Sequence, residues 1–170
     1  MKKQMLTRII NITCAVLLVA LFASFFLPSW DFTDKVKVDG SREKVEVPSN
    51  SSVMEFTWMA FNNKELSKQF NKQGYEVNDI VVMPFVLTLC VVAGVIACLL
   101  NMNGSWHSVF PVIGGGFTAI NLLTNSALQM GPYWTVNLIL AIALFAVSAV
   151  LFGILVKKIV DWFVIKHRRL

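Results

Sequence analysis

Long apolar segments separated by polar stretches dominate the chain. One segment runs from about Ile9 to Leu27, and a far longer one, from Ile80 to Val156, contains no Asp, Glu, Lys or Arg. A transmembrane helix needs about 20 apolar residues, so the first segment fits one span and the second fits three. The pattern predicts a membrane all-α fold in which four transmembrane helices form a bundle.

Two short polar or glycine-containing stretches, 101–105 and 124–132, interrupt the long segment. Pro132 suits the first turn of a helix, because it lacks the N–H that such a position leaves unpaired. The three helices predicted here cover about 80–100, 106–123 and 133–156. Beyond Val156 apolar residues are mixed with basic ones, and we expect the last helix to continue into this tail.

The polar segment 29–79 contains two kinds of periodicity, one after the other. Valine alternates with charged residues over about 34–48, which predicts a β-hairpin. Ser52 and Glu55 then match a capping box, and apolar residues at helical spacing follow them. A second short helix is expected over 64–73. The segment therefore predicts a small α+β loop module, with a hairpin and short helices.

The apolar face of the first loop helix has two interpretations. It comprises Val53, Phe56, Thr57, Ala60 and Phe61, with Trp58 beside it. The face either packs against the hairpin or the membrane surface, or it forms a docking surface for a partner protein. For the second interpretation the candidate contacts are Phe56, Trp58 and Phe61.

The distribution of charge predicts the orientation. Basic residues gather at both chain ends: Lys2, Lys3, Arg8, Lys157, Lys158, Lys166, Arg168 and Arg169. Cytoplasmic segments are rich in Lys and Arg, so both termini are predicted to be cytoplasmic, with the plasma membrane as the location. The chain then divides into a cytoplasmic tail with the first helix, an extracytoplasmic loop module, three further helices and a basic juxtamembrane tail: 1–28, 29–79, 80–156 and 157–170.

Composition supports a membrane class. Hydrophobic residues make up 56% of the chain and charged residues 15%, against about 45–50% and about 25% in soluble domains. The net charge of +5 reflects the basic ends, where anionic lipids of the inner surface are the expected partner. Nucleic-acid binding is not expected, because it needs a basic stripe on a soluble face.

Aromatic residues lie near the ends of the predicted helices. Trp and Tyr favour the two membrane–water interfaces. The outer interface is predicted to carry Trp30, Tyr133 and Trp134, and the inner one Trp106 and Trp162.

Small and polar residues within the apolar segments suggest helix contacts. Gly94, Gly115, Ala119 and Gly153 belong to small-xxx-small patterns, which allow close helix packing within the chain or with another subunit. Asn121 and Asn137 carry amides that need partners. They predict either an interhelical hydrogen bond or a polar ligand site near the outer ends of the last two helices.

No arrangement of residues predicts catalysis, a metal site or a cofactor. Cys14, Cys90 and Cys98 have no metal-binding spacing, so they are small hydrophobes in helix interfaces or, alternatively, a redox relay. His107 has no acid or second histidine near it in the sequence, which favours an interfacial polar residue over a catalytic base. We therefore do not expect an enzyme.

The layout resembles that of the claudin and peripheral-myelin-protein class of four-helix membrane proteins. Leu27-Pro28-Ser29-Trp30 after the first helix looks like the Trp-containing entry to the first outer loop of that class. The resemblance is one of architecture, because Met59-Ala60-Phe61 follows Trp58 and the loop contains no cysteine. It implies no functional residue for this chain.

These features predict a non-enzymatic membrane protein that works by binding. An accessory subunit of a membrane complex or a cell-surface assembly protein is expected, with contacts through the loop module and the small-residue helix faces. The partner is another membrane protein or a second copy. The alternative is a small transporter or channel subunit that forms a homo-oligomer.

Overall fold

The computed structural model describes residues 2–30, 51–64, 67–68, 77–100, 105–124 and 131–167. The helices in these ranges are α1 (Lys2–Ser24), α2 (Val53–Asn62), α4 (Val77–Leu100), the 3₁₀ helix η1 (Trp106–Ser108), α5 (Val109–Thr124) and α6 (Trp134–His167). Two short strands, β1 (Pro28–Trp30) and β2 (Ser51–Ser52), complete the described elements. The hairpin predicted over 34–48 and most of the helix predicted over 64–73 lie outside the described residues.

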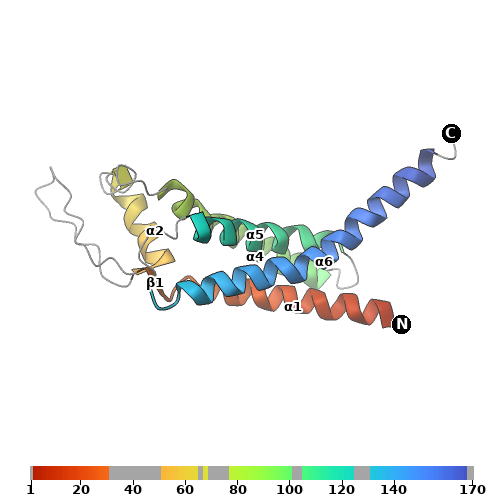
Figure 1. The fold of residues 1–170 in the computed structure, drawn as a ribbon, viewed down its shortest axis with the longest axis horizontal. Coiled ribbons are helices and arrows are strands. Elements are labelled where there is room, and N and C mark those ends of the chain that lie inside the picture. Colours follow the sequence, from red (N-terminus) through yellow and green to blue (C-terminus); the bar gives the residue numbers. More distant parts are fainter. Residues whose placement is uncertain are drawn as a thin grey trace, which may run out of the picture.

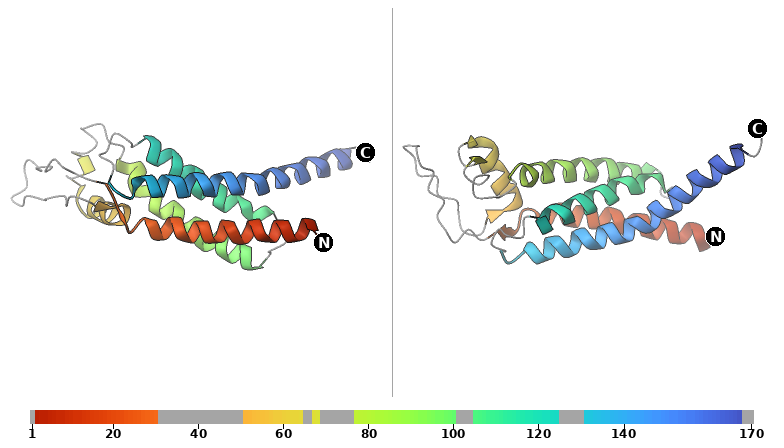
Figure 2. Two further views of the ribbon diagram at one scale, coloured as in Figure 1. Left: turned by 60° about the horizontal axis from the view of Figure 1, so that its bottom comes forward. Right: turned by 45° about the horizontal axis from the view of Figure 1, so that its top comes forward.

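The four long helices lie side by side along one direction (Figure 1, Figure 2). α5 packs between α4 and α6, and α1 packs against both α4 and α6. Both chain ends lie at one end of this bundle, whereas α2 and β1 lie at the other. The arrangement is a helical bundle with a small cap of loop structure at the end remote from the termini.

Among the described residues, three helical segments are long and apolar enough to cross a membrane: Gln4–Ser24, Ile80–Cys98 and Trp134–Ile165. They support the prediction of a membrane protein. The fourth predicted span corresponds to α5, which has 16 residues where about 20 are usual. α1 ends at Ser24, earlier than predicted, because turn hydrogen bonds such as that from Phe25 N–H to the Phe22 carbonyl follow it.

Apolar side chains fill the bundle and also cover its outside. Leu18, Leu87 and Leu144 are fully buried between the helices. Large apolar residues on the outward faces, such as Leu89 and Ile120, are mostly exposed. Helices of water-soluble proteins carry polar residues on such faces. An exterior of this kind matches a lipid environment.

A two-stranded sheet closes the end of the bundle that carries α2. β1 pairs with β2 in antiparallel fashion. On the other side of β1, the carbonyls of Ser29 and Pro28 accept hydrogen bonds from the N–H groups of Gly131 and Tyr133. β1 therefore joins the start of α2 to the start of α6. The sequence did not predict this pairing, because Ser51–Ser52 is too short to show a strand pattern.

α6 is longer than the bundle that it helps to form. It continues past Val156 to His167, as expected from the sequence, and has 34 residues in total. At 1.5 Å per residue it is about 51 Å long. Its C-terminal part leaves the other helices (Figure 1), and the described side chains from Val156 to Ile165 are exposed.

Candidate functional surfaces

The capping box of α2 forms as predicted and fixes the direction of this helix. The Ser52 hydroxyl accepts from the Glu55 N–H at 3.1 Å, and the Glu55 carboxylate accepts from the Ser52 N–H at 3.4 Å. The Met54 N–H also donates to the carbonyl of Phe25, at the end of α1. These contacts hold α2 across the end of the bundle.

The three aromatic residues proposed as partner contacts separate into two groups. Phe56 is 1% exposed and belongs to the core, so it is not available to a partner. The buried side of α2 is the stripe Val53, Phe56, Thr57 and Ala60, which has the spacing i, i+3, i+4, i+7. Phe61 lies at the edge of that stripe and is 66% exposed, while Trp58 is 70% exposed.

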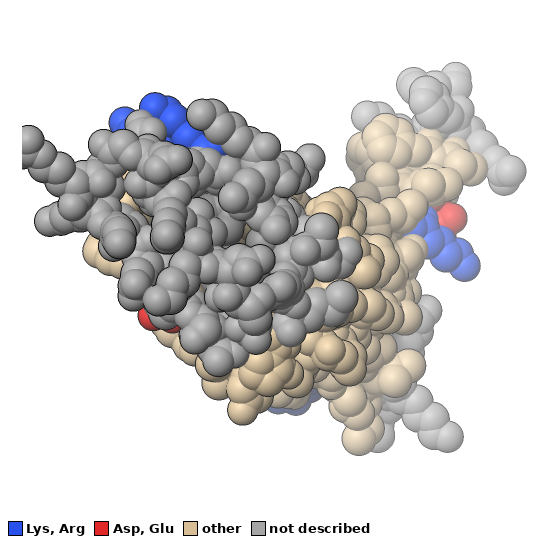
Figure 3. All heavy atoms as spheres, turned by 60° about the vertical axis from the view of Figure 1, so that its left-hand side comes forward, with Lys and Arg blue, Asp and Glu red and all other residues tan. Residues whose placement is uncertain are grey.

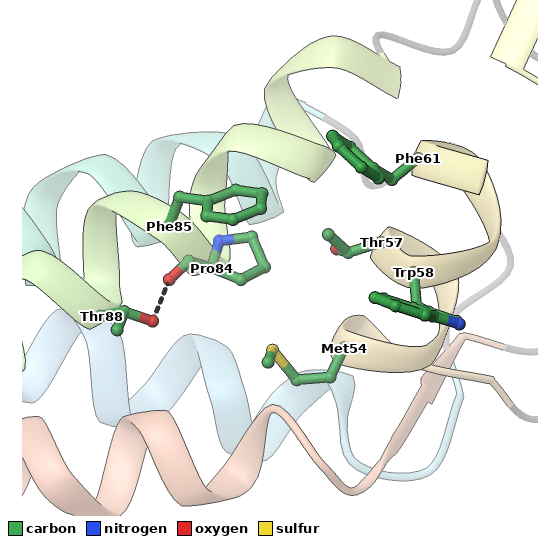
Figure 4. A pocket seen from close by; sticks show the side chains of 7 residues that line it. All are labelled: Met54, Thr57, Trp58, Phe61, Pro84, Phe85 and Thr88. Atoms are coloured by element: carbon green, nitrogen blue, oxygen red, sulfur yellow. Dashed lines mark hydrogen bonds between the residues drawn. The ribbon is translucent and has the colours of Figure 1, made fainter. Parts of the chain in front are cut away.

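The exposed side of α2 forms a groove with the outer part of α4. The groove has a volume of about 360 Å³ and is lined by Met54, Thr57, Trp58, Phe61, Pro84, Phe85 and Thr88. Figure 4 shows the residues of α2 facing Pro84 and Phe85 across it. The hydroxyls of Thr57 and Thr88 donate to the carbonyls of Val53 and Pro84, at 2.8 and 2.7 Å. The groove is therefore apolar. The sequence did not predict it, because its two walls are remote in the chain.

Three of the four small residues proposed for packing occupy helix contacts within the chain. Gly94, Gly115 and Ala119 are buried. A Cβ atom at Gly115 would lie 2.8 Å from the backbone nitrogen of Phe145 and 2.9 Å from the Ala141 carbonyl oxygen. α5 and α6 therefore touch at this glycine.

Gly153 differs, because it makes no packing contact with the described residues. It is exposed, and a Cβ atom there would have no atom within 4 Å. Leu151 and Ile154 on either side of it still pack against the core, so Gly153 lies on the outward face of α6. Ala146 and Ala149 on the same side of α6 are also exposed. Small residues thus remain uncovered along one part of α6.

The two asparagines proposed as polar residues within the spans make different contacts. Asn137 is fully buried, and its amide nitrogen donates to the Ser29 hydroxyl at 2.7 Å, which links α6 to β1. Ser29 in turn donates to the Leu27 carbonyl. The amide of Asn121 donates to the Phe117 carbonyl one turn earlier in α5. Asn137 therefore bonds to the loop cap, whereas Asn121 bonds within its own helix.

The proposed interface aromatics lie at the two ends of the bundle, with one difference in exposure. Tyr133, Trp106 and Trp162 are exposed. Trp134 is only 8% exposed, so its ring packs inside the protein and does not face lipid. Its position as the first residue of α6, beside the cap, explains this burial. Trp30 lies in β1, and its side chain is outside the described part.

The end of the bundle near the termini contains a buried imidazole. His107 in η1 is 3% exposed, and neither ring nitrogen has a hydrogen-bond partner among the described residues. The ammonium of Lys158 on α6 lies 3.3 Å from the hydroxyl of Ser105, just before η1. This contact joins the C-terminal helix to the turn that precedes α5.

The three cysteines are free thiols buried in the bundle. Cys98 donates to the Asn11 carbonyl of α1 at 3.4 Å. Among the described residues no group of three His, Cys, Asp or Glu side chains is placed to hold a metal ion. The three thiols occupy packed positions between the helices.

The fold and these surfaces define a class, a helical membrane protein with a groove and an uncovered helix face. No family model matches the chain, and neither a curated protein nor a solved structure shows significant similarity to it.

Proposed function

We propose that this protein is a non-enzymatic scaffold of the plasma membrane, with four transmembrane helices and an extracytoplasmic loop module. It would serve as an accessory subunit of a membrane complex or of a cell-surface assembly. The proposal combines three apolar helices with an α6 surface whose small residues no part of this chain covers in the described structure. The uncovered small residues on α6 are the observation on which the proposed binding function rests.

α5 would be the fourth span. Its 16 residues extend over about 24 Å at 1.5 Å per residue, and η1 adds one short turn at its inner end. A short span is accommodated by local thinning of the bilayer at a modest cost. α5 also packs between α4 and α6, both of which are candidate spans. With four spans the layout would resemble that of the claudin and peripheral-myelin-protein class.

Both termini would be cytoplasmic, since they lie at one end of the bundle and carry eight of the fifteen basic residues, all close to the predicted spans. α2 and the sheet would then face the outside. The tail would be held at the inner surface, because α6 exposes Trp162 and Phe163 there next to Lys157 and Lys158. Basic residues beside a span attract anionic lipids, and tryptophan favours the headgroup level.

Cysteine accessibility tests this orientation. Asn62, at the end of α2, and Asp161, on α6, are exposed, whereas the native cysteines are buried and should give little background. We expect Asn62→Cys in intact cells to react with a membrane-impermeant maleimide. Asp161→Cys should react only after permeabilisation. The reverse pattern would refute the proposed orientation.

The partner-binding surface would be the side of α6 with Ala146, Ala149 and Gly153. Their spacing of three and four residues places them together on a helix. Transmembrane helices associate through such small residues, which allow the backbones to approach closely. Gly94 and Gly115 meet side chains or backbone of this chain, but Gly153 meets none. A helix of another membrane protein would complete the contact.

Substitution on this surface tests the function. Gly153→Phe should abolish co-purification of a stoichiometric partner from mild detergent, with insertion and thermal unfolding unchanged because the site is open. Val136→Phe is the matched control, since Val136 is also exposed on α6 but lies near its other end. A partner that both variants retain would contradict the proposal. A wild-type protein that forms only homo-oligomers would instead favour the small transporter or channel subunit.

A further inference from the structure

The groove between α2 and α4 lies at a defined depth along a candidate span. Pro84, Phe85 and Thr88 follow the start of that span, Ile80, by four to eight residues. At 1.5 Å per residue they lie about 6–12 Å along the helix from Ile80. In a membrane the α4 wall of the groove would therefore be at the level of the acyl chains. The α2 wall would be close to the boundary with the headgroups.

The orientation of Trp58 agrees with this depth. Figure 4 shows its ring beside the groove and its indole nitrogen pointing away from it. Tryptophan at a membrane interface places its apolar ring toward the acyl chains and its N–H toward the polar layer. The exposed ring of Trp58 therefore suits the upper rim of a lipid-facing groove.

The lining of the groove offers few free hydrogen-bonding groups to a polar ligand. The two hydroxyls in the groove, on Thr57 and Thr88, already donate to carbonyls of their own helices. The other lining side chains are apolar or aromatic. At this depth there is no water to fill the space, and an unfilled apolar space forfeits the dispersion contacts of its walls. An apolar guest is therefore required.

The dimensions favour a narrow guest. A helix is about 10–12 Å wide and docks through anchors spread over about two turns. The α4 wall extends only from Pro84 to Thr88, a little more than one turn. The volume of about 360 Å³ is at the low end of the range of about 300–1,000 Å³ found for ligand pockets. A single hydrocarbon chain fits this space better than a helix does.

Positive charge follows the groove-lining part of α2. Lys64, three residues after Phe61, and Lys68 both have exposed side chains. Figure 3 views this end of the molecule and shows a group of basic atoms at its edge. Basic residues near a membrane surface attract the phosphate of lipid headgroups.

We propose that the groove binds a phospholipid of the outer leaflet. One acyl chain lies between α2 and α4, and the phosphodiester lies near Lys64 and Lys68. The site is distinct from the proposed partner surface on α6 and goes beyond the scaffold function. It ties α2 to the bundle through a lipid and places the loop module at the level of the headgroups.

Native mass spectrometry of the full-length protein tests the proposal. After delipidation and addition of phosphatidylglycerol, the wild-type protein should retain one lipid per monomer. Thr88→Phe, which fills the groove, should lose it. Val92→Phe should keep it, because Val92 is exposed one turn further along α4 and does not line the groove. Lys64→Gln should weaken retention of the lipid about fivefold.

Equal retention of lipid by Thr88→Phe and Val92→Phe would overturn the proposal. A wild-type dimer that Thr88→Phe converts to a monomer, with no lipid bound to either, would overturn it in favour of a second copy as the occupant. If Thr88→Phe fails to fold, the quenching of tryptophan fluorescence by phospholipids with brominated acyl chains provides a second test. The fraction of fluorescence that these lipids quench should be larger for the wild-type protein than for Trp58→Phe. Equal fractions for the two proteins would refute the site.

Discussion

Replacing Gly115 by alanine is expected to lower the free energy of unfolding by about 1–3 kcal/mol, the range for an overpacked core. The added methyl group would lie 2.8 and 2.9 Å from backbone atoms of α6, at Phe145 and Ala141. A backbone cannot rotate away as a flexible side chain can, so α5 and α6 must move apart. Leucine at this position adds further atoms that the contact cannot hold and should prevent the two helices from packing.

Gly153→Ala is the matched control for this prediction. It makes the same chemical change in α6, where the added methyl group would meet no atom within 4 Å. Its helix propensity should make it neutral or slightly stabilising, by up to about 1 kcal/mol. The two variants are compared by their unfolding curves, measured by titration with a denaturing detergent. Equal midpoints would show that α5 and α6 do not touch at Gly115.

The contrast between these glycines shows what spacing can and cannot predict. The small-xxx-small pattern identifies positions where helices are able to approach, and Gly115 is one of them. The pattern does not predict which helix packs against such a position, or whether any helix does. Gly153 lies on the outward face of α6, beside the buried Leu151. Which face of α6 meets its neighbours depends on how all the helices pack together.

The apolar spans and the α2 capping box were predictable because each depends on residues that are close in sequence. Length and hydropathy predict the spans, and the Ser52–Glu55 spacing predicts the cap. The groove, the bond from Asn137 to Ser29 and the burial of Trp134 depend on segments that are distant in the chain. Residue type indicates that Asn137 needs a partner, but only the fold identifies it as Ser29.

Phe56 shows the same limit and leads to the second large expected effect. Its side chain is among the largest that are fully buried, and it belongs to the same cluster as Phe25, Ile80 and Met83. It is therefore part of the core where α2 packs against α4. Truncating a buried phenylalanine removes its transfer free energy and leaves a cavity. Phe61 has the same chemistry five residues later but is mostly exposed.

Phe56→Ala is expected to destabilise the protein by about 3–5 kcal/mol, whereas Phe61→Ala should change stability by no more than about 0.5 kcal/mol. Detergent titration measures both, and limited proteolysis within the loop should be faster for Phe56→Ala because α2 loses its main contact with the bundle. The control compares the same substitution in the same helix, so helix propensity cancels. A cost for Phe61→Ala equal to that of Phe56→Ala would mean that both rings pack in the core. An absence of any cost for Phe56→Ala would mean that α2 is not packed on the bundle and that its aromatic residues are all free to meet a partner.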